Sequence, residues 1–177
     1  KPVSEEKESD PRPWELLHEE IVEGDVTGLE ETLEDLTPTE IARALSRLSP
    51  ADQSQLLTLL PADEAAELVV EVPDAQAADM IERLSPEEAA PIVVALPSAE
   101  QANLLGDISK SAAEEILTEL PEEEATEARE LLSYPDESAG GVMVTEILKY
   151  RNHWTVGDVL TDFREFADQY VDFNVQY

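Results

Sequence analysis

Large aliphatic residues recur along the middle of the chain at a constant spacing of twelve. The residues that mark this repeat are Leu36, Leu48, Leu60, Val72, Leu84, Leu96, Ile108, Leu120 and Leu132. Alanine often lies five positions after a marker, and apolar pairs such as Leu56/Leu57 lie eight and nine after it. Offsets of 5, 8, 9 and 12 fall on one face of a helix with 3.6 residues per turn. The pattern predicts one short helix per repeat, with one buried face.

Proline follows most markers by one or two residues. Thr37, Ser49 and Ser85 each precede a proline and can cap a helix in which that proline takes the first position. Proline also disfavours the helical conformation in the residue before it, which ends the preceding helix. Each unit therefore holds a helix of roughly nine residues, which is unstable alone and must pack on its neighbours.

Two more helices are predicted before the repeat, one from Trp14 to Glu23 and one capped by Asp25. The fold class is therefore mainly α: an α-solenoid of about ten short helices on a 12-residue repeat. Residues 1–11 are a polar, disordered lead-in, 12–132 form the helical domain, and 133–141 are a linker by composition.

The pattern changes in residues 142–177. Thr155 and Asp158 are a capping signal for another helix. Residues 171–177 alternate apolar and polar side chains, which predicts a half-buried strand. One helix and short extended segments cannot close a core, so this stretch is expected to be the incomplete beginning of an α/β domain.

Net charge narrows the possible partners. The chain has 42 Asp and Glu against 11 Lys and Arg, a net charge of −31. Nucleic acid and anionic lipid are therefore not expected as partners. The absence of cysteine excludes thiolate chemistry, and no apolar run is long enough for this fragment to insert into a membrane. No known catalytic motif occurs, so we expect no enzyme activity.

Two segments resemble a known family. Residues 134–143 read Tyr-Pro-Asp-Glu-Ser-Ala-Gly-Gly-Val-Met, and residues 154–160 read Trp-Thr-Val-Gly-Asp-Val-Leu. Together they resemble the junction between the N domain and the CBS domains in the MgtE family of magnesium transporters. The Leu-Ser-Pro-Glu-Glu unit at 84–88 is similar to that N domain as well. The resemblance implies a right-handed superhelix over 12–132 and a truncated first CBS domain over 142–177.

The resemblance also implies a function. It places the chain at the cytoplasmic face of the cell membrane, as the soluble regulatory region of a homodimeric transporter whose remaining CBS and transmembrane domains are its partners. In that family weakly bound Mg²⁺ bridges acidic surfaces of the N and CBS domains and favours the closed pore. Such bridging is physically reasonable, because a divalent cation removes the repulsion between two carboxylate surfaces.

Candidate metal contacts follow from the same resemblance. Asp136 and Glu137 lie in the linker, and the backbone carbonyl of Gly141 corresponds to one that can face an ion in the family. The metal-contacting positions of the family's N domain fall near Ala99, Glu100 and Asn103, of which only Glu100 is acidic.

Two alternatives stay open. The solenoid is also typical of a protein-interaction scaffold, similar to HEAT repeats or to the helical domain of the flagellar motor protein FliG, whose acidity only confers solubility and which has no ion-sensing role. The acidity is equally consistent with adaptation to a high-salt cytoplasm, since the chain has only 4 lysines.

Overall fold

The computed structural model describes residues 12–134, 138, 150 and 153–165. The secondary structure within these ranges is eleven α-helices, with no strand. Their bounds are α1 Pro13–Glu23, α2 Val26–Glu34, α3 Pro38–Leu45, α4 Pro50–Leu59, α5 Ala62–Glu71, α6 Asp74–Ile81, α7 Pro86–Ala95, α8 Ser98–Asp107, α9 Lys110–Glu119, α10 Glu122–Leu132 and α11 Val156–Glu165.

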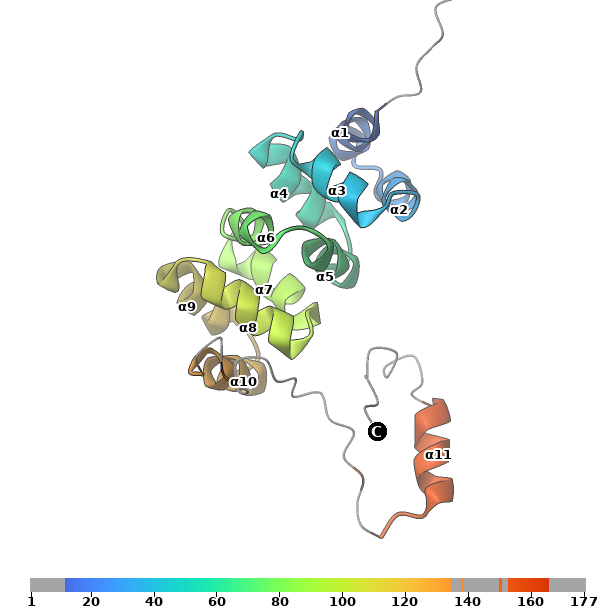
Figure 1. The fold of residues 1–177 in the computed structure, drawn as a ribbon, viewed down its shortest axis with the longest axis vertical. Helices are drawn as coiled ribbons and strands as arrows, with labels where there is room; N and C mark the ends of the chain where they lie inside the picture. The colour runs from blue at the N-terminus through green and yellow to red at the C-terminus, as the bar shows by residue number, and fades with distance from the viewer. Residues whose placement is uncertain (1–11, 135–137, 139–149, 151–152, 166–177) are drawn as a thin grey trace, which may run out of the picture.

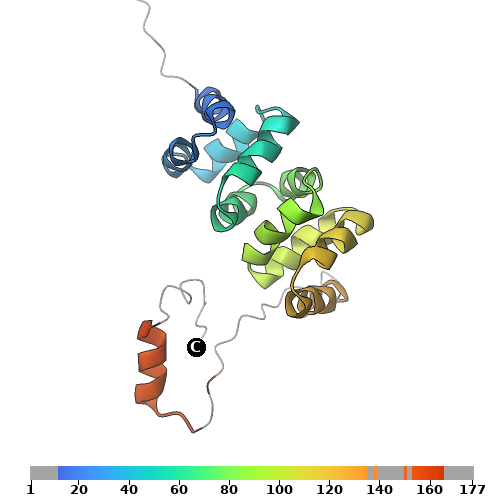
Figure 2. The ribbon, with the colours of Figure 1, turned by 180° about the vertical axis from the view of Figure 1, so that it is seen from behind.

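Helices α1 to α10 form a stack. Helix α1 packs mainly on α2, whereas from α5 onward each helix packs mainly on the one two positions further along the chain. Helix α5 contacts α7 and α7 contacts α9, while α6 contacts α8 and α8 contacts α10. Odd-numbered and even-numbered helices in this part of the chain therefore form two rows. Figure 1 and Figure 2 show the stack from opposite sides. The predicted mainly α solenoid of about ten short helices is confirmed.

The repeat positions line a continuous core. All eight residues that lie five after a marker are buried, as are the apolar pairs at eight and nine in the central helices. A single cluster of buried side chains runs from Leu17 in α1 to Ala128 in α10. Burial of one face of each helix thus holds together helices that would not form separately.

Two kinds of junction join the helices. At α3, α4 and α7 a Ser or Thr caps the helix and the proline occupies its first turn, as predicted. At Ser49, for example, the hydroxyl accepts a hydrogen bond from the Asp52 N–H at 3.1 Å. Where proline directly follows the marker, it takes the N-cap position itself, at Pro61, Pro73, Pro97 and Pro121. In both kinds a single residue separates the marker from the helix, and the second kind has no side-chain cap.

The predictions for the segments before and after the repeat have different outcomes. Helix α1 ends at Gly24 in the left-handed conformation (φ 69°), and Asp25 caps α2, both as expected. Thr155 and Asp158 cap α11, with the Asp158 N–H donating to the Thr155 hydroxyl at 3.2 Å. The lead-in 1–11, the segment 139–149 and the predicted strand 171–177 lie outside the described residues. Among the described helices, none combines the length and apolar character needed to cross a bilayer.

At two of the positions five residues after a marker, where alanine is usual, the buried residue is a glutamine. Gln53 donates from Nε2 to the carbonyl of Leu45 at 2.7 Å, and Gln101 donates from Nε2 to the carbonyl of Val93 at 2.9 Å. Each reaches back eight residues, to the last turn of the preceding helix. Helical carbonyls there lack their usual partner four residues later, and for Val93 that residue is Pro97, which has no N–H. Besides the N–H groups of Leu48 and Leu96, the glutamines therefore give these buried carbonyls a second donor that alanine could not supply.

We expect Gln101→Leu to destabilise the fold by about 1 kcal/mol, because the buried Val93 carbonyl would keep only the longer bond from the Leu96 N–H. Asn103→Leu, an exposed position on the same helix, is the matched control, with an expected change within about 0.5 kcal/mol. Urea unfolding followed by circular dichroism measures both. Equal midpoints for the two variants would contradict a structural role for this hydrogen bond.

Candidate cation-binding surface

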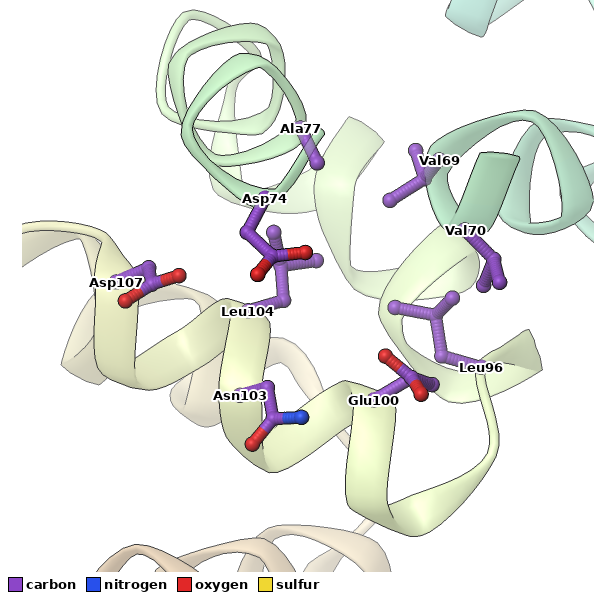
Figure 3. A pocket seen from close by; sticks show the side chains of 9 residues that line it. All are labelled: Val69, Val70, Asp74, Ala77, Leu96, Glu100, Asn103, Leu104 and Asp107. Atoms are coloured by element: carbon purple, nitrogen blue, oxygen red, sulfur yellow. The ribbon is translucent and has the colours of Figure 1, made fainter. Parts of the chain in front are cut away.

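A small pocket lies where α5, α6 and α8 meet. Its volume is about 30 Å³, and its floor consists of buried apolar side chains: Val69, Ala77, Leu96 and Leu104. Its rim is polar and exposed, and consists of Asp74, Glu100, Asn103 and Asp107, together with the half-exposed Val70 (Figure 3). We call the three carboxylates Asp74, Glu100 and Asp107 the acidic rim.

Helix α8 supplies most of this polar edge. Glu100, Asn103 and Asp107 follow one another at spacings of three and four, which places them along one face of the helix. The adjoining face buries Gln101, Leu104 and Leu105. Burial of that face therefore turns the polar residues outward, beside Asp74 on α6 (Figure 3).

The helix termini make the three acids electrostatically unequal. Asp74 is the first residue of α6 and Glu100 lies in the first turn of α8, where the positive end of the helix dipole favours a carboxylate. Asp107 is the last residue of α8, where the exposed carbonyls disfavour it. Asp107 is thus the rim acid for which a nearby cation would relieve the most repulsion.

The acidic rim is not a closed metal site. No three Asp, Glu or His side chains in the described ranges 12–134 and 153–165 come together closely enough to hold a metal ion. Each carboxylate of the acidic rim would therefore contact an ion individually rather than as part of a preformed cluster of ligands. Mg²⁺ commonly keeps several of its waters and needs only one or two carboxylates, so the arrangement fits a hydrated ion whose other ligands come from elsewhere.

The predicted metal contacts divide between described and undescribed residues. Glu100 lies on the acidic rim, whereas Asp136, Glu137 and Gly141 lie outside the described residues. Sequence reasoning did not find Asp107 or Asp74. The spacing of seven from Glu100 could have found Asp107, because it shares a helix face. Asp74 has no such signal, since only the packing of α6 against α8 brings it to the rim.

Comparison with known proteins gives a family match and two similar structures. Residues 36–137 match the family described as the MgtE intracellular N domain. The crystal structure of the soluble part of a magnesium transporter is 27% identical, with a TM-score of 0.72, and the match covers 88% of this chain and 62% of that one. The cytosolic domain of the Mg²⁺ channel MgtE in complex with ATP is also 27% identical, with a TM-score of 0.71 and coverage of 86% and 63%.

The chain thus spans less than two thirds of the length of either structure. No curated protein sequence matches it.

Asp74 begins its helix and Asp107 ends its helix, so we expect the substitution of Asp by Asn to have opposite effects on stability at the two positions. Without divalent ions, Asp107→Asn should raise the urea midpoint, because it removes a negative charge from the carboxyl end of α8. Asp74→Asn should lower it or leave it unchanged, because that charge is favoured at the start of α6. Both effects should shrink as monovalent salt rises from about 20 mM to about 500 mM. A stabilising Asp74→Asn, or effects that do not depend on salt, would contradict this assignment.

Proposed function

Because this chain belongs to the family of the MgtE intracellular N domain, we propose that it is the cytosolic Mg²⁺-sensing regulatory region of a magnesium transporter or channel. The observation that carries the proposal is the family match over residues 36–137, which the structural likeness to the soluble part of a magnesium transporter supports. The family is one of transporter domains rather than enzymes, and we propose a role without catalysis.

In this proposal the domain boundaries are those expected from the sequence. Residues 12–132 form the N domain, 133–141 the linker and 142–177 the start of a CBS domain. The remaining CBS and transmembrane domains of the same homodimeric transporter are the partners. The chain then lies at the cytoplasmic face of the membrane.

The proposed mechanism rests on repulsion between like-charged surfaces. The acidic rim and the net charge of −31 would oppose close approach of a second acidic domain. Hydrated Mg²⁺ between the two surfaces removes this repulsion and binds the compact arrangement better than the open one. Such differential affinity shifts the population toward the compact arrangement, which in the transporter favours the closed pore.

The proposed ligands are few and the binding is weak. Glu100 would contribute from α8, with Asp107 close to it on the same face. Asp136, Glu137 and the carbonyl of Gly141 would contribute from the linker. One or two carboxylates for each ion suffice, because Mg²⁺ retains most of its water.

Thermal melting of the complete cytosolic region tests the proposal. Millimolar Mg²⁺ should raise Tm more than monovalent salt of equal ionic strength, because the ion binds the folded, compact state. At ten times its Kd, one bound ion adds about 1.4 kcal/mol. For a chain of this size that corresponds to a rise of about 3–6 °C. Small-angle scattering should show a smaller radius of gyration under the same conditions.

The double variant Glu100→Gln/Asp107→Asn should lose part of the Mg²⁺-specific shift. The double variant Glu87→Gln/Glu127→Gln, which removes two exposed acids elsewhere on the solenoid, should keep it. If wild type neither compacts nor gains stability beyond the monovalent control, ion sensing is wrong and an interaction scaffold becomes the better explanation.

A further inference from the structure

Helix α2 is held less firmly than the helices of the central repeats. Of its nine residues only Leu29 is fully buried, with Leu33 half-buried beside it. Helices α5, α6 and α7 each bury four residues. Apolar contact therefore contributes little to the docking of α2, and the polar contacts along its two sides contribute a larger share of its stability.

On one side, α2 meets a half-buried carboxyl group of α1. The Thr32 hydroxyl donates to Oε1 of Glu20 at 2.8 Å. Oε2 of the same carboxyl is buried and has no hydrogen-bond partner among the described residues. Burial raises the pKa of Glu20, the hydrogen bond from Thr32 offsets part of this rise, and the neighbouring charges of Asp25, Glu19 and Glu31 add to it.

Gly28 permits this close approach of α2 to α1. A Cβ atom at Gly28 would lie 2.8 Å from Oδ2 of Asp25 and 3.3 Å from Cγ of Glu20. The Gly28 N–H donates to Oδ1 of Asp25 at 3.1 Å, which caps α2. The Glu20 side chain therefore lies against the first turn of α2.

On its other side, α2 meets a carboxyl group of α5. Glu30 and Glu64 are both half-buried, and their carboxyl groups lie close enough for the charge of one to act on the other. Two neighbouring carboxyl groups repel each other less when one of them carries a proton. Burial first, and then the charge of Glu30, raise the pKa of Glu64.

The charged groups that act on these carboxyls are themselves acidic. They are Glu19 on α1, Asp25 and Glu31 at α2, and Asp63 and Glu67 on α5. From α4, Asp52 faces α1 but is paired with His18 at 3.3 Å. Arg12, before α1, and Arg47, after α3, both lie over the ring of Trp14. The two carboxyl contacts of α2 thus have no basic partner in the described residues.

We propose that the docking of α2 between α1 and α5 is proton-dependent, so that α2 packs firmly at mildly acidic pH and loosens as the pH rises. The sign follows from the two carboxyl contacts. A carboxyl whose pKa is higher in the docked state than in the open state favours docking when it is protonated. The pKa values of Glu20 and Glu64 are raised above the ordinary glutamate value of 4.5. The docked state of α2 is therefore stabilised as the pH falls through these raised pKa values, and this stabilisation is lost as the pH rises toward neutral and alkaline values.

Hydrogen exchange of the α2 amides tests this inference in the complete chain. Mass spectrometry would compare protection at about pH 7.5 and about pH 5.5, corrected for the intrinsic exchange rate, with EDTA present to remove divalent ions. In wild type, protection of α2 should be higher at the lower pH. Protection of α7 should change much less, because no such carboxyl contact holds it.

The double variant Glu20→Gln/Glu64→Gln removes both titrating groups and keeps an acceptor for Thr32. Its α2 should be as protected at the higher pH as wild type is at the lower pH. Glu119→Gln/Glu127→Gln, which removes two exposed acids from α9 and α10, should retain the wild-type pH response of α2. An unchanged α2 response in the first variant, or wild-type protection that falls on acidification, would overturn the proposal. Loss of the pH response of α2 in the Glu119→Gln/Glu127→Gln variant would also overturn it, because a general decrease in negative charge would then be the cause.

Discussion

The structure depends on one constraint: its helices are too short to be stable alone. Helices of 8 to 11 residues form α1 to α10, and each must bury one face against helices elsewhere in the stack. Packing between helices two apart in sequence creates two rows with one continuous core. Because each helix depends on its neighbours, stability is distributed along the solenoid, and it is lowest where a helix buries few side chains, as in α2.

The same constraint explains how the fold tolerates a net charge of −31. One face of each helix is apolar, so the acids occupy the other faces and the first turns, where water and helix dipoles favour them. The departures from this arrangement are the informative ones. Asp107 sits at an unfavourable helix end, while Glu20, Glu30 and Glu64 are half-buried between helices. In the two proposals these positions give the acidity local consequences beyond solubility: one concerns cations at the rim, and the other concerns protons at α2.

Local signals made much of the fold predictable. The spacing of twelve, the Ser-Pro and Thr-Pro caps and Gly24 correctly predicted where helices begin and end. Gln53 and Gln101 looked like irregularities in the alanine positions, because the sequence does not reveal that a buried carbonyl of the preceding helix needs a donor. Of the candidate site, Glu100 was predicted through the family resemblance and Asp107 was accessible through helix periodicity. Asp74 could not be found, because its place on the rim depends on how α6 packs against α8.

The sequence by itself determined the helices, their buried faces and the family. These properties depend on residues a few positions apart, and hydrophobic period and capping chemistry report them directly. Only the tertiary structure decided which acids meet. Asp74 and Glu100 come from helices separated by α7, and Glu30 and Glu64 lie 34 residues apart on α2 and α5. Such encounters follow from the stacking of the two helix rows, which no local pattern encodes.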